Sequence, residues 1–532
     1  MAIDIFLLVL VLFVIVSSVV VNVKILIYYQ DSEVSGFASS VLCKAIIVLS
    51  LTFAWVVNLL LPIDVRNSRP RPGILDMQLI WTFAFIMLAV FLVLVVPAAM
   101  FYHEVEGDDF VKKKRKHVLC SILFTLFITG CSVAISYPFL SDAAIPVVQF
   151  ACGTAENAWL DGDDGRTAAE LGSQICSNGI PAEVNIQVSL QIYIIACLCF
   201  VGWFFLVMFG GIGLSAVPLD LILSFTDRPK AIDESTYQQR RRLLAAATRK
   251  LLGRSEELQQ RDSEVSAGKG WRARRQKGKL KTEYNRFKRD VLLLEEEHER
   301  LLICKFHRGE PIAVSALKLV LGICFAILSL AWILHIILYI LTQAMTDSGE
   351  PATLFLNELF AAFEGSGVYP LGVAFFAVFT LYLLACVVKG CLKFGMRIMF
   401  LFSIHPMRYQ ATPLNSILFN VEMVLITSAA VVQFSQQAFA DYARLTDADV
   451  IFAAQIKHMR FYGFFYKNNV FIYMLLGWFL LALIFLLVRP RDTGDVVKFD
   501  SKTDKKLLKM AGVTAKGAKG GTTSDSVAST SA

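Results

Sequence analysis

The stretch 469–489, NVFIYMLLGWFLLALIFLLVR, has no charged residue between Asn469 and Arg489. A transmembrane helix needs roughly 20 mostly apolar residues to cross the hydrocarbon core of a bilayer. Eight further stretches of similar length and composition precede this one in the chain. Membrane-spanning β-strands are excluded because these runs are too long, do not alternate, and would need a closed barrel. We therefore predict an all-α polytopic membrane protein with about nine transmembrane helices.

The predicted spans are residues 4–28, 40–62, 78–102, 117–138, 189–213, 313–342, 370–394, 415–439 and 469–489. Hydrophobic residues make up 56% of the chain and charged residues 18%, and a soluble domain of this length could not bury so much apolar surface. The first apolar run continues past Val20 with no small-residue cleavage site after it, so we expect a span there and no cleavable signal peptide.

The loops between the predicted spans differ in charge. The short loop 103–116 ends in five consecutive basic residues, and the insert 226–312 has 22 Lys and Arg against 14 Asp and Glu. The loop 138–187 has seven acidic residues and one base, Arg166. Because basic loops stay on the cytosolic side, we predict that 138–187 and the N-terminus are lumenal or extracellular. The insert 226–312 and the C-terminus are then cytosolic.

Four regions follow from this pattern. Residues 1–225 hold the first five spans, 226–312 form the cytosolic insert, 313–490 hold the last four spans, and 491–532 form a tail. The tail is rich in Lys, Gly, Ser and Thr, which is typical of a disordered segment. Two short stretches, 297–302 and 504–508, fit dileucine sorting signals. We expect the first to be buried and the second to be accessible.

The insert has the heptad spacing of a coiled coil. Apolar residues alternate at steps of four and three in its second half: Leu280, Tyr284, Phe287, Val291, Leu294, His298 and Leu301. In its first half, one tyrosine and three leucines recur every seven residues: Tyr237, Leu244, Leu251 and Leu258. Thr248 and Ser255 lie between them. We predict an antiparallel helical hairpin. The alternative is a protein partner that pairs with residues 237–302.

The sequence contains no motif for catalysis. It lacks a Walker loop, a dinucleotide fingerprint, an HExxH pair and a nucleophile elbow, so we expect neither an enzyme nor an ATP-driven pump. No Cys or His spacing suggests a metal site, and no cofactor is expected. A basic loop beside a membrane does not imply nucleic acid, whereas membrane lipids are expected partners. Cys152 and Cys176 share the acidic loop, where a disulfide is chemically permitted; two free thiols are the alternative.

Polar residues inside the predicted spans are the candidate functional residues. An ionisable side chain in a span costs several kcal/mol unless it faces protein or water. Glu422 and His335 are the strongest candidates, and Gln433 and Asn58 are the other polar members of this candidate intramembrane site. An internal polar contact and the lining of a cavity are both open interpretations for Glu422 and His335.

Small residues gather where the fifth span ends. Gly210, Gly211 and Gly213 allow close helix packing or a hinge, and Pro218 favours a break of the helix at the cytosolic surface.

Several motifs resemble one known family. They are LPIDV at 61–65, PAAMFY at 97–102 with EVEGD at 104–108, GLSAVPLDLI at 213–222, and NSILFN at 415–420. These motifs are similar to those of the LIMR family, the limb-region-type membrane proteins. That family includes the lysosomal cobalamin transport protein and lipocalin-receptor-like proteins. The stretches 431–435 and 438–443 resemble its plant and protist branch, whereas Glu422 departs from the family pattern.

The resemblance implies nine spans with a lumenal N-terminus. It also implies two alternative functions, with no catalytic residues to carry over. The first is a transport or transport-escort component of the lysosomal or endosomal membrane, with cobalamin or another small molecule as cargo. The second is a receptor or scaffold that binds a lipocalin-like ligand or a signalling partner, and for it the plasma membrane is the alternative location.

Overall fold

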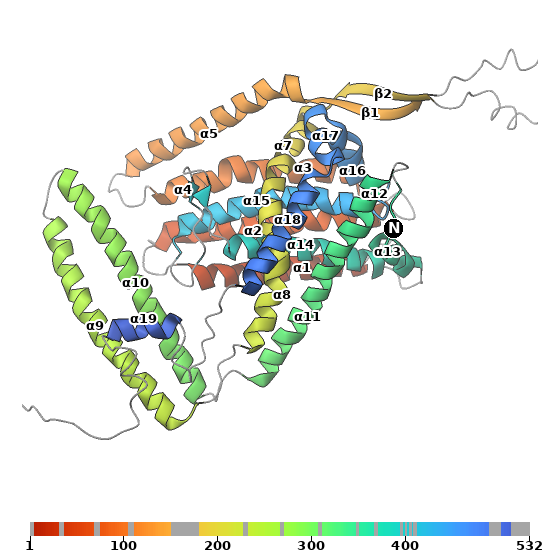
Figure 1. Cartoon of the computed structure of the whole chain (residues 1–532). Coiled ribbons are helices and arrows are strands. Elements are labelled where there is room, and N and C mark those ends of the chain that lie inside the picture. The colour runs from red at the N-terminus through yellow and green to blue at the C-terminus, as the bar shows by residue number, and fades with distance from the viewer. Residues whose placement is uncertain are drawn as a thin grey trace, which may run out of the picture. The chain divides into compact units, whose positions relative to one another are not determined.

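The computed structural model describes residues 5–30, 37–68, 75–104, 111–149, 180–226, 232–266, 271–306, 311–346, 350–365, 371–393, 397–398, 402–403, 407, 412–488 and 502–511 (Figure 1). The chain divides into two compact units. The first comprises Met1–Ala216 and Leu328–Ile484, and the second comprises Val217–Ile327 and Phe485–Ala532.

The described residues contain nine helical segments that are long and apolar enough to span a membrane, which confirms the predicted number. They are Val11–Tyr29, Val41–Asn67, Met77–His103, Val118–Leu140, Leu190–Thr226, Ile312–Met345, Leu371–Lys393, Leu414–Ala438 and Val470–Val488. The helices that form them are α1 (Ile5–Tyr29), α2 (Phe37–Asn67), α3 (Met77–Val90), α4 (Val96–Glu104), α5 (Val111–Leu140), α7 (Leu190–Phe205), α8 (Gly211–Thr226), α11 (Ile312–His335), α12 (Thr342–Met345), α14 (Leu371–Lys393), α15 (Leu414–Ala438) and α18 (Val470–Val488).

Within the described residues, three spans contain a π-helical turn, in the middle of the third and fifth spans and near the end of the sixth. These turns are Phe91–Val95, Leu206–Gly210 and Ile336–Leu341, and they join α3 to α4, α7 to α8, and α11 to α12. The fifth span differs from the prediction, because α8 continues through Pro218 to Thr226 without a break. Proline has no N–H to donate to the carbonyl of Leu214, and the side chain of Ser329 donates to that carbonyl in its place.

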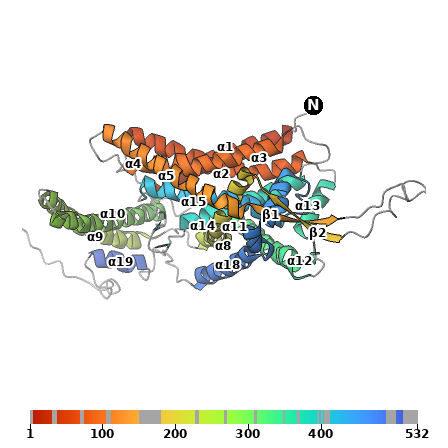
Figure 2. The same cartoon turned by 90° about the horizontal axis from the view of Figure 1, so that it is seen from above.

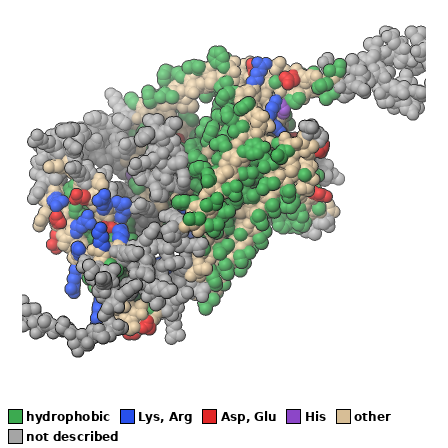
Figure 3. Space-filling view, in the orientation of Figure 1, with side chains coloured by type: hydrophobic (Ala, Val, Ile, Leu, Met, Phe, Trp, Pro, Cys, Tyr) green, Lys and Arg blue, Asp and Glu red, His purple; other side chains and the backbone are tan. Residues whose placement is uncertain are grey.

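Helix α15 lies at the centre of the first unit. It packs against α2, α4, α7 and α14, and 78% of its most apolar stretch is buried (Figures 1 and 2). The corresponding stretch of α5 has no buried residue, so its apolar side chains face outward. Figure 3 shows hydrophobic side chains over the visible face of the spans. These helices imply direct contact with membrane lipid.

The structure also contains strands, which the prediction of helices did not include. Strands β1 (Asp142–Gln149) and β2 (Ile180–Gln187) form an antiparallel pair in which Asp142 lies opposite Gln187. A second pair, β3 (Arg397–Ile398) and β4 (Phe402–Ser403), is very short. Cys152 and Cys176 lie outside the described residues.

The segment between α15 and α18 shares one end of the first unit with β1 and β2. It consists of α16 (Asp447–Asp449), a π-helical turn (Val450–Gln455), a 3₁₀ turn (Ile456–His458) and α17 (Arg460–Lys467). Met459 forms a backbone bridge with Ala143 of β1, and Arg460 Nη2 donates to Asn185 Oδ1 at 3.3 Å. The loop after the fourth span and the loop after the eighth span therefore lie at the same end, as the predicted topology requires. Which end faces the lumen stays a prediction.

In the second unit, α9 (Glu234–Ser266) and α10 (Trp271–Phe306) lie side by side (Figure 1). Their ion pairs run in opposite directions along the two helices, since Arg254 pairs with Asp290 at 3.7 Å and Arg261 with Glu283 at 3.4 Å. The helices are therefore antiparallel. Leu244, Leu251 and Leu258 are buried at their seven-residue spacing.

The predicted seam of α10 is only half apolar. Leu301 is buried and Phe287 and Leu294 are half-buried, but Tyr284, Val291 and His298 are exposed. Inward positions between the apolar ones are instead taken by Glu283 and Asp290, which form the ion pairs with α9. The predicted seam was therefore wrong at Tyr284, Val291 and His298, which are every second position of the alternation. Ion pairs of the residues next to two of them, Glu283 and Asp290, replace apolar contact across the hairpin. In α9 likewise, Thr248 is exposed and Ser255 half-buried.

The tail differs from the expected disorder over Lys502–Ala511, which form α19. This helix packs on α9, and its Leu507 joins a hydrophobic cluster with Leu244, Leu301 and Cys304. The insert and α19 therefore lie on the same side of the membrane.

Candidate ligand pocket

A buried carboxylate connects three elements at the end of the first unit that holds the loop after the eighth span. Asp64, near the end of α2, is fully buried and accepts a hydrogen bond of 2.8 Å from Trp81 Nε1 of α3. The same carboxylate accepts the backbone N–H groups of Ala448 at 2.8 Å and Asp447 at 3.4 Å, at the start of α16. Asp64 therefore fixes the segment that follows α15 against the second and third spans. Satisfying free N–H groups at a helix start is a favourable role for a carboxylate.

The pocket lies between the ends of the sixth and eighth spans and the segment that follows α15. It has a volume of about 290 Å³. Its walls are formed by Ile340, Gln343, Ala344, Gln433, Gln436, Gln437, Ala440, Phe452, Ala453, Lys457, Tyr466, Lys467 and Asn469. All of these residues belong to the first unit.

Hydrogen bonds hold three of the pocket amides in place. Gln433 Oε1 accepts from Trp203 Nε1 at 2.9 Å, and Gln436 Nε2 donates to Asp449 Oδ1 at 2.8 Å. Gln437 Nε2 donates to Asn469 Oδ1 at 3.3 Å. Spacings of three and four residues place these glutamines on adjacent positions of one helix surface. The pocket wall contributed by α15 is thus polar and fixed by contacts with other elements.

Two lysines give the pocket a positive charge. Lys457 is half-buried and Lys467 is exposed, and neither ammonium group has a hydrogen bond or ion pair with the residues that the structure describes. Burial lowers the pKa of Lys457, and the neighbouring Lys467 lowers it further, while Asp449 opposes the shift. The pocket lining contains no acidic residue. An unpaired, partly buried ammonium beside amide groups is suited to hold an anion.

The structure brings Gln433 into this pocket but not the other three polar candidates. His335 is fully buried, contacts the carbonyl oxygen of Ala438 through Nε2 at 2.7 Å, and stacks between Tyr339 and Phe439. This is an internal polar contact and not the lining of the pocket. Glu422 lies 16 residues before Ala438 in α15, about 24 Å along the helix, so Glu422 and His335 do not form one site.

Asn58 has a packing role. It is buried in α2, where its Nδ2 donates to Ala54 O at 2.9 Å and to Ser428 O of α15 at 3.4 Å. It therefore joins two spans through backbone acceptors.

The glycines at the fifth span allow close helix packing. A Cβ on Gly213 would lie 1.8 Å from the carbonyl oxygen of Cys386 in α14, and one on Gly390 would lie 2.0 Å from that of Phe209. The two helices therefore touch through backbone at both glycines. Gly210 and Gly211 have more room, with nearest atoms at 3.1 Å, and Gly210 ends the π-helical turn.

Sequence reasoning missed Lys457, Lys467, Gln436, Gln437 and Asn469. A signal existed for the glutamines, because Gln433, Gln436 and Gln437 have helical spacing near the end of a span. The lysines gave no such signal, since they lie in the segment between the last two spans, whose pocket neighbours include residues distant in sequence. Among the residues that the structure describes, no group of three His, Cys, Asp or Glu could hold a metal ion.

The sequence matches the family described as LMBR1-like membrane protein over residues 4–284 and 229–486. It is 30% identical over 504 residues to a LIMR family protein of Dictyostelium discoideum, an alignment that covers 88% of this chain and 95% of the relative. A LIMR family protein of rice is 32% identical, with 88% and 92% covered, and one of Arabidopsis thaliana is 31% identical, with 85% and 89% covered. No solved structure matches. The similar proteins thus come from plants and a protist, as the motifs at 431–443 indicated.

Proposed function

Because this chain belongs to the LIMR family of LMBR1-like membrane proteins, we propose that it is a transport or transport-escort component of a lysosomal or endosomal membrane. The ligand that it holds is a small anionic solute, bound in the pocket at the end of α15. Catalysis forms no part of this proposal.

The positive charge of the pocket carries the proposal. Lys457 and Lys467 have no acidic partner in the lining, and a cation that is partly removed from water is costly unless an anion pairs with it. The side-chain amides of Gln433, Gln436 and Gln437 lie in the same wall, and Gln343 lines the pocket from the sixth span. Amide N–H groups and ammonium groups together are the donors that recognise carboxylate, sulfate or phosphate oxygens.

The size of the pocket favours a small solute over cobalamin. A volume of about 290 Å³ holds roughly ten water molecules at about 30 Å³ each. It is near the lower limit of small-molecule sites, which span about 300–1,000 Å³. A corrin ring with its nucleotide arm is larger than this space. Cobalamin, which family kinship suggested, is therefore not our choice of ligand for this pocket.

The predicted orientation places the pocket on the lumenal side. In that orientation the sixth and eighth spans both begin on the cytosolic side and finish on the lumenal side, and the pocket lies beside their finishing ends. An acidic lumen would keep Lys457 protonated despite its lowered pKa. This combination supports anion capture from an acidic compartment.

Counterflow into proteoliposomes tests the transport role. The purified full chain is reconstituted with unlabelled sulfate inside, and uptake of radiolabelled sulfate is measured. We expect uptake above that of protein-free vesicles and a loss of about tenfold for Lys457→Gln, since an ionic hydrogen bond contributes about 1.5–3 kcal/mol. Lys24→Gln is the matched control, because Lys24 is exposed on α1 and outside the pocket. If the wild type and both variants gave no more uptake than protein-free vesicles, the result would contradict a transport role.

One observation favours the receptor as the second candidate. The ribbon β1–β2 exposes Val148, Ile180 and Val184, with 58%, 63% and 47% of their surface accessible. An exposed two-stranded ribbon presents unpaired edges on which another chain can add a strand. Binding of sulfate without counterflow would move the proposal to this receptor function, for which the plasma membrane is the alternative location.

A further inference from the structure

The short helix α19 buries its two leucines against the hairpin of α9 and α10. Leu507 has 1% of its surface exposed and Leu508 has 4%. Leu507 lies in a cluster with Leu244, Leu301 and Cys304, so it occupies apolar space contributed by both helices. Burial of a leucine contributes about 1.5–3 kcal/mol, which is enough to dock a short helix but not to fix it permanently.

Charge complements this apolar contact. Lys506 Nζ lies 2.8 Å from Asp290 Oδ1, and Asp290 also pairs with Arg254 of α9 at 3.7 Å. The stretch 502–509 has four Lys and one Asp, and in α10 the position Asp290 is followed by four Glu at 295–299. The ion pair between Lys506 and Asp290 is partly exposed, so it is weak and sensitive to salt.

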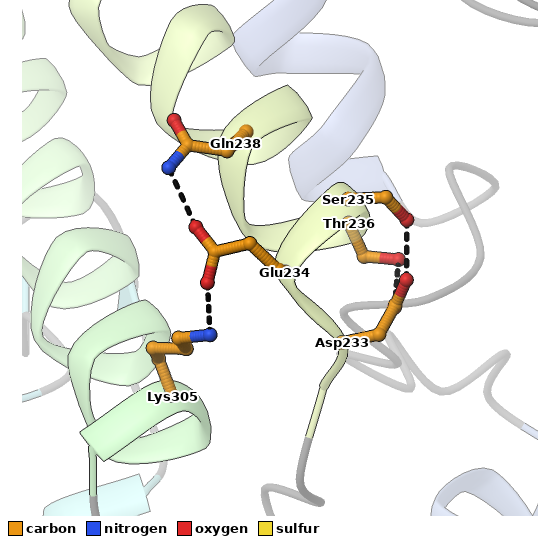
Figure 4. A network of polar contacts seen from close by, with 6 residues as sticks. All are labelled: Asp233, Glu234, Ser235, Thr236, Gln238 and Lys305. Carbon is orange, nitrogen blue, oxygen red and sulfur yellow. Dashed lines mark hydrogen bonds and ion pairs between the residues drawn. The ribbon is translucent and has the colours of Figure 1, made fainter.

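The hairpin that receives α19 is fixed by its own contacts. Where α9 begins and α10 ends, Lys305 of α10 pairs with Glu234 of α9, and Gln238 Nε2 donates to the same carboxylate at 2.7 Å (Figure 4). Asp233 caps α9 by accepting from Thr236 Oγ1 at 2.6 Å and from the hydroxyl of Ser235. Hydrogen bonds from these two hydroxyl groups lower the pKa of Asp233 to about 2. These contacts lie within the hairpin and its first residues and do not involve α19.

The segment that docks is also one of the two dileucine stretches of the sequence. In DKKLL at 504–508, an acidic residue is followed at the third and fourth positions by leucines. A protein that reads such a signal needs both leucine side chains in apolar pockets and the acid beside a basic group. In the docked helix both leucines are already buried, so the signal that we expected to be accessible is not.

We propose that α19 is a displaceable internal ligand of the α9–α10 hairpin, and that its docking conceals the dileucine signal from cytosolic sorting adaptors. The adaptor class is one with paired apolar pockets beside a basic patch. A helix of ten residues is not stable in water without tertiary contact, so release also unfolds it. The unfolded segment is then available as a linear peptide.

A charge reversal at Lys506 weakens the docking of α19 without changing the acid and the leucines of the dileucine signal. Lys506→Glu places a negative charge beside Asp290 but leaves the acid and both leucines of the signal unchanged. Lys509→Glu is the matched control, since Lys509 is exposed on the same helix and outside the signal. In the purified full chain, we expect amide hydrogen exchange of residues 502–511 to be severalfold faster in Lys506→Glu than in the wild type. Lys509→Glu should exchange like the wild type, and α9 and α10 should be unchanged in all three.

Cell-surface biotinylation of the full chain then measures the fraction of the protein at the plasma membrane, which depends on the dileucine signal. We expect a smaller surface fraction for Lys506→Glu than for the wild type and Lys509→Glu, and restoration when Leu507→Ala and Leu508→Ala are added. Wild-type exchange of 502–511 as fast as that of a free peptide would overturn the docking. Faster exchange in Lys506→Glu with an unchanged surface fraction would overturn the concealment.

Discussion

The hydroxyl of Ser329 donates a hydrogen bond of 2.8 Å to the carbonyl oxygen of Leu214, the helix acceptor that Pro218 leaves without its N–H donor. The two residues belong to different spans, the sixth and the fifth. Proline inside a membrane helix is tolerated where a neighbouring side chain satisfies the free carbonyl. This contact explains why α8 continues past Pro218 where the sequence predicted a break.

A double-mutant cycle tests this relationship. Ser329→Ala leaves the Leu214 carbonyl unsatisfied in the membrane interior, and we expect it to lower the free energy of unfolding by about 1–3 kcal/mol. In the background of Pro218→Ala the cost should be smaller by about 1 kcal/mol, because residue 218 then donates its own N–H. Unfolding in detergent micelles measures each term. Ser329 also bonds Tyr382 at 2.6 Å, so Tyr382→Phe controls for that loss, and equal costs in both backgrounds would contradict the account.

Replacing Gly213 tests the close contact of the fifth and seventh spans. Gly213→Ala would place a Cβ 1.8 Å from the carbonyl oxygen of Cys386, a distance that only movement of the backbone can relieve. We expect a loss of stability of about 3 kcal/mol or more, seen as a lower yield of monodisperse protein. Gly130→Ala in α5 is the control, because nothing lies within 4 Å of its added Cβ and the helix propensity gained is the same. Normal yield of Gly213→Ala would show that the helices are not packed this closely.

The carboxylate of Asp64 is predicted to hold the segment after α15. Asp64→Asn keeps the size of the side chain but cannot accept on both of its terminal atoms, so one of its three N–H donors loses a partner. We expect a destabilisation of about 1–3 kcal/mol and faster hydrogen exchange at Asp447 and Ala448. Trp81→Phe removes a single donor and should affect these two amides less. Unaltered exchange in Asp64→Asn would mean that α16 is fixed by other contacts.

The spans were predictable because the bilayer imposes one simple length rule on the sequence. All nine appear within the described residues, near their predicted bounds. The π-helical turns were not predictable, since turns such as Leu206–Gly210 have the same apolar composition as the helix around them. The predicted seam of α10 was correct at every second position, because heptad spacing shows which side of a helix is apolar. It does not show that Asp290 faces α9, since that depends on Arg254 in the other helix.

The pocket was the least predictable part. Gln433 could be selected as a polar residue within a span, but Lys457 reaches the pocket only because the chain returns past the end of α15. Glu422 and His335 were grouped because both lie in spans, and a sequence does not say at which depth or on which face each side chain lies. The leucines of α19 were expected in solvent because composition suggested disorder, and the docking surface is more than 200 residues away in sequence.

The affinity for sulfate should fall as pH rises. Sulfate itself does not titrate near neutral pH, so the change reports the protein. Burial and Lys467 lower the pKa of Lys457, and the protonated ammonium is the form that binds. Binding is therefore complete below this lowered pKa and is lost as pH rises through it, below the usual lysine value of about 10.4. Titration calorimetry at a series of pH values measures this, and an affinity that rises with pH would contradict it.

The most direct test is equilibrium binding of sulfate to the purified full chain, the Lys457→Gln variant and the Lys24→Gln control, measured by calorimetry below neutral pH. The account predicts saturable binding to the wild type and to Lys24→Gln, and a dissociation constant at least about tenfold higher for Lys457→Gln. Equal affinity of Lys457→Gln and the wild type, or no binding of sulfate to either, would contradict an anion site at the end of α15.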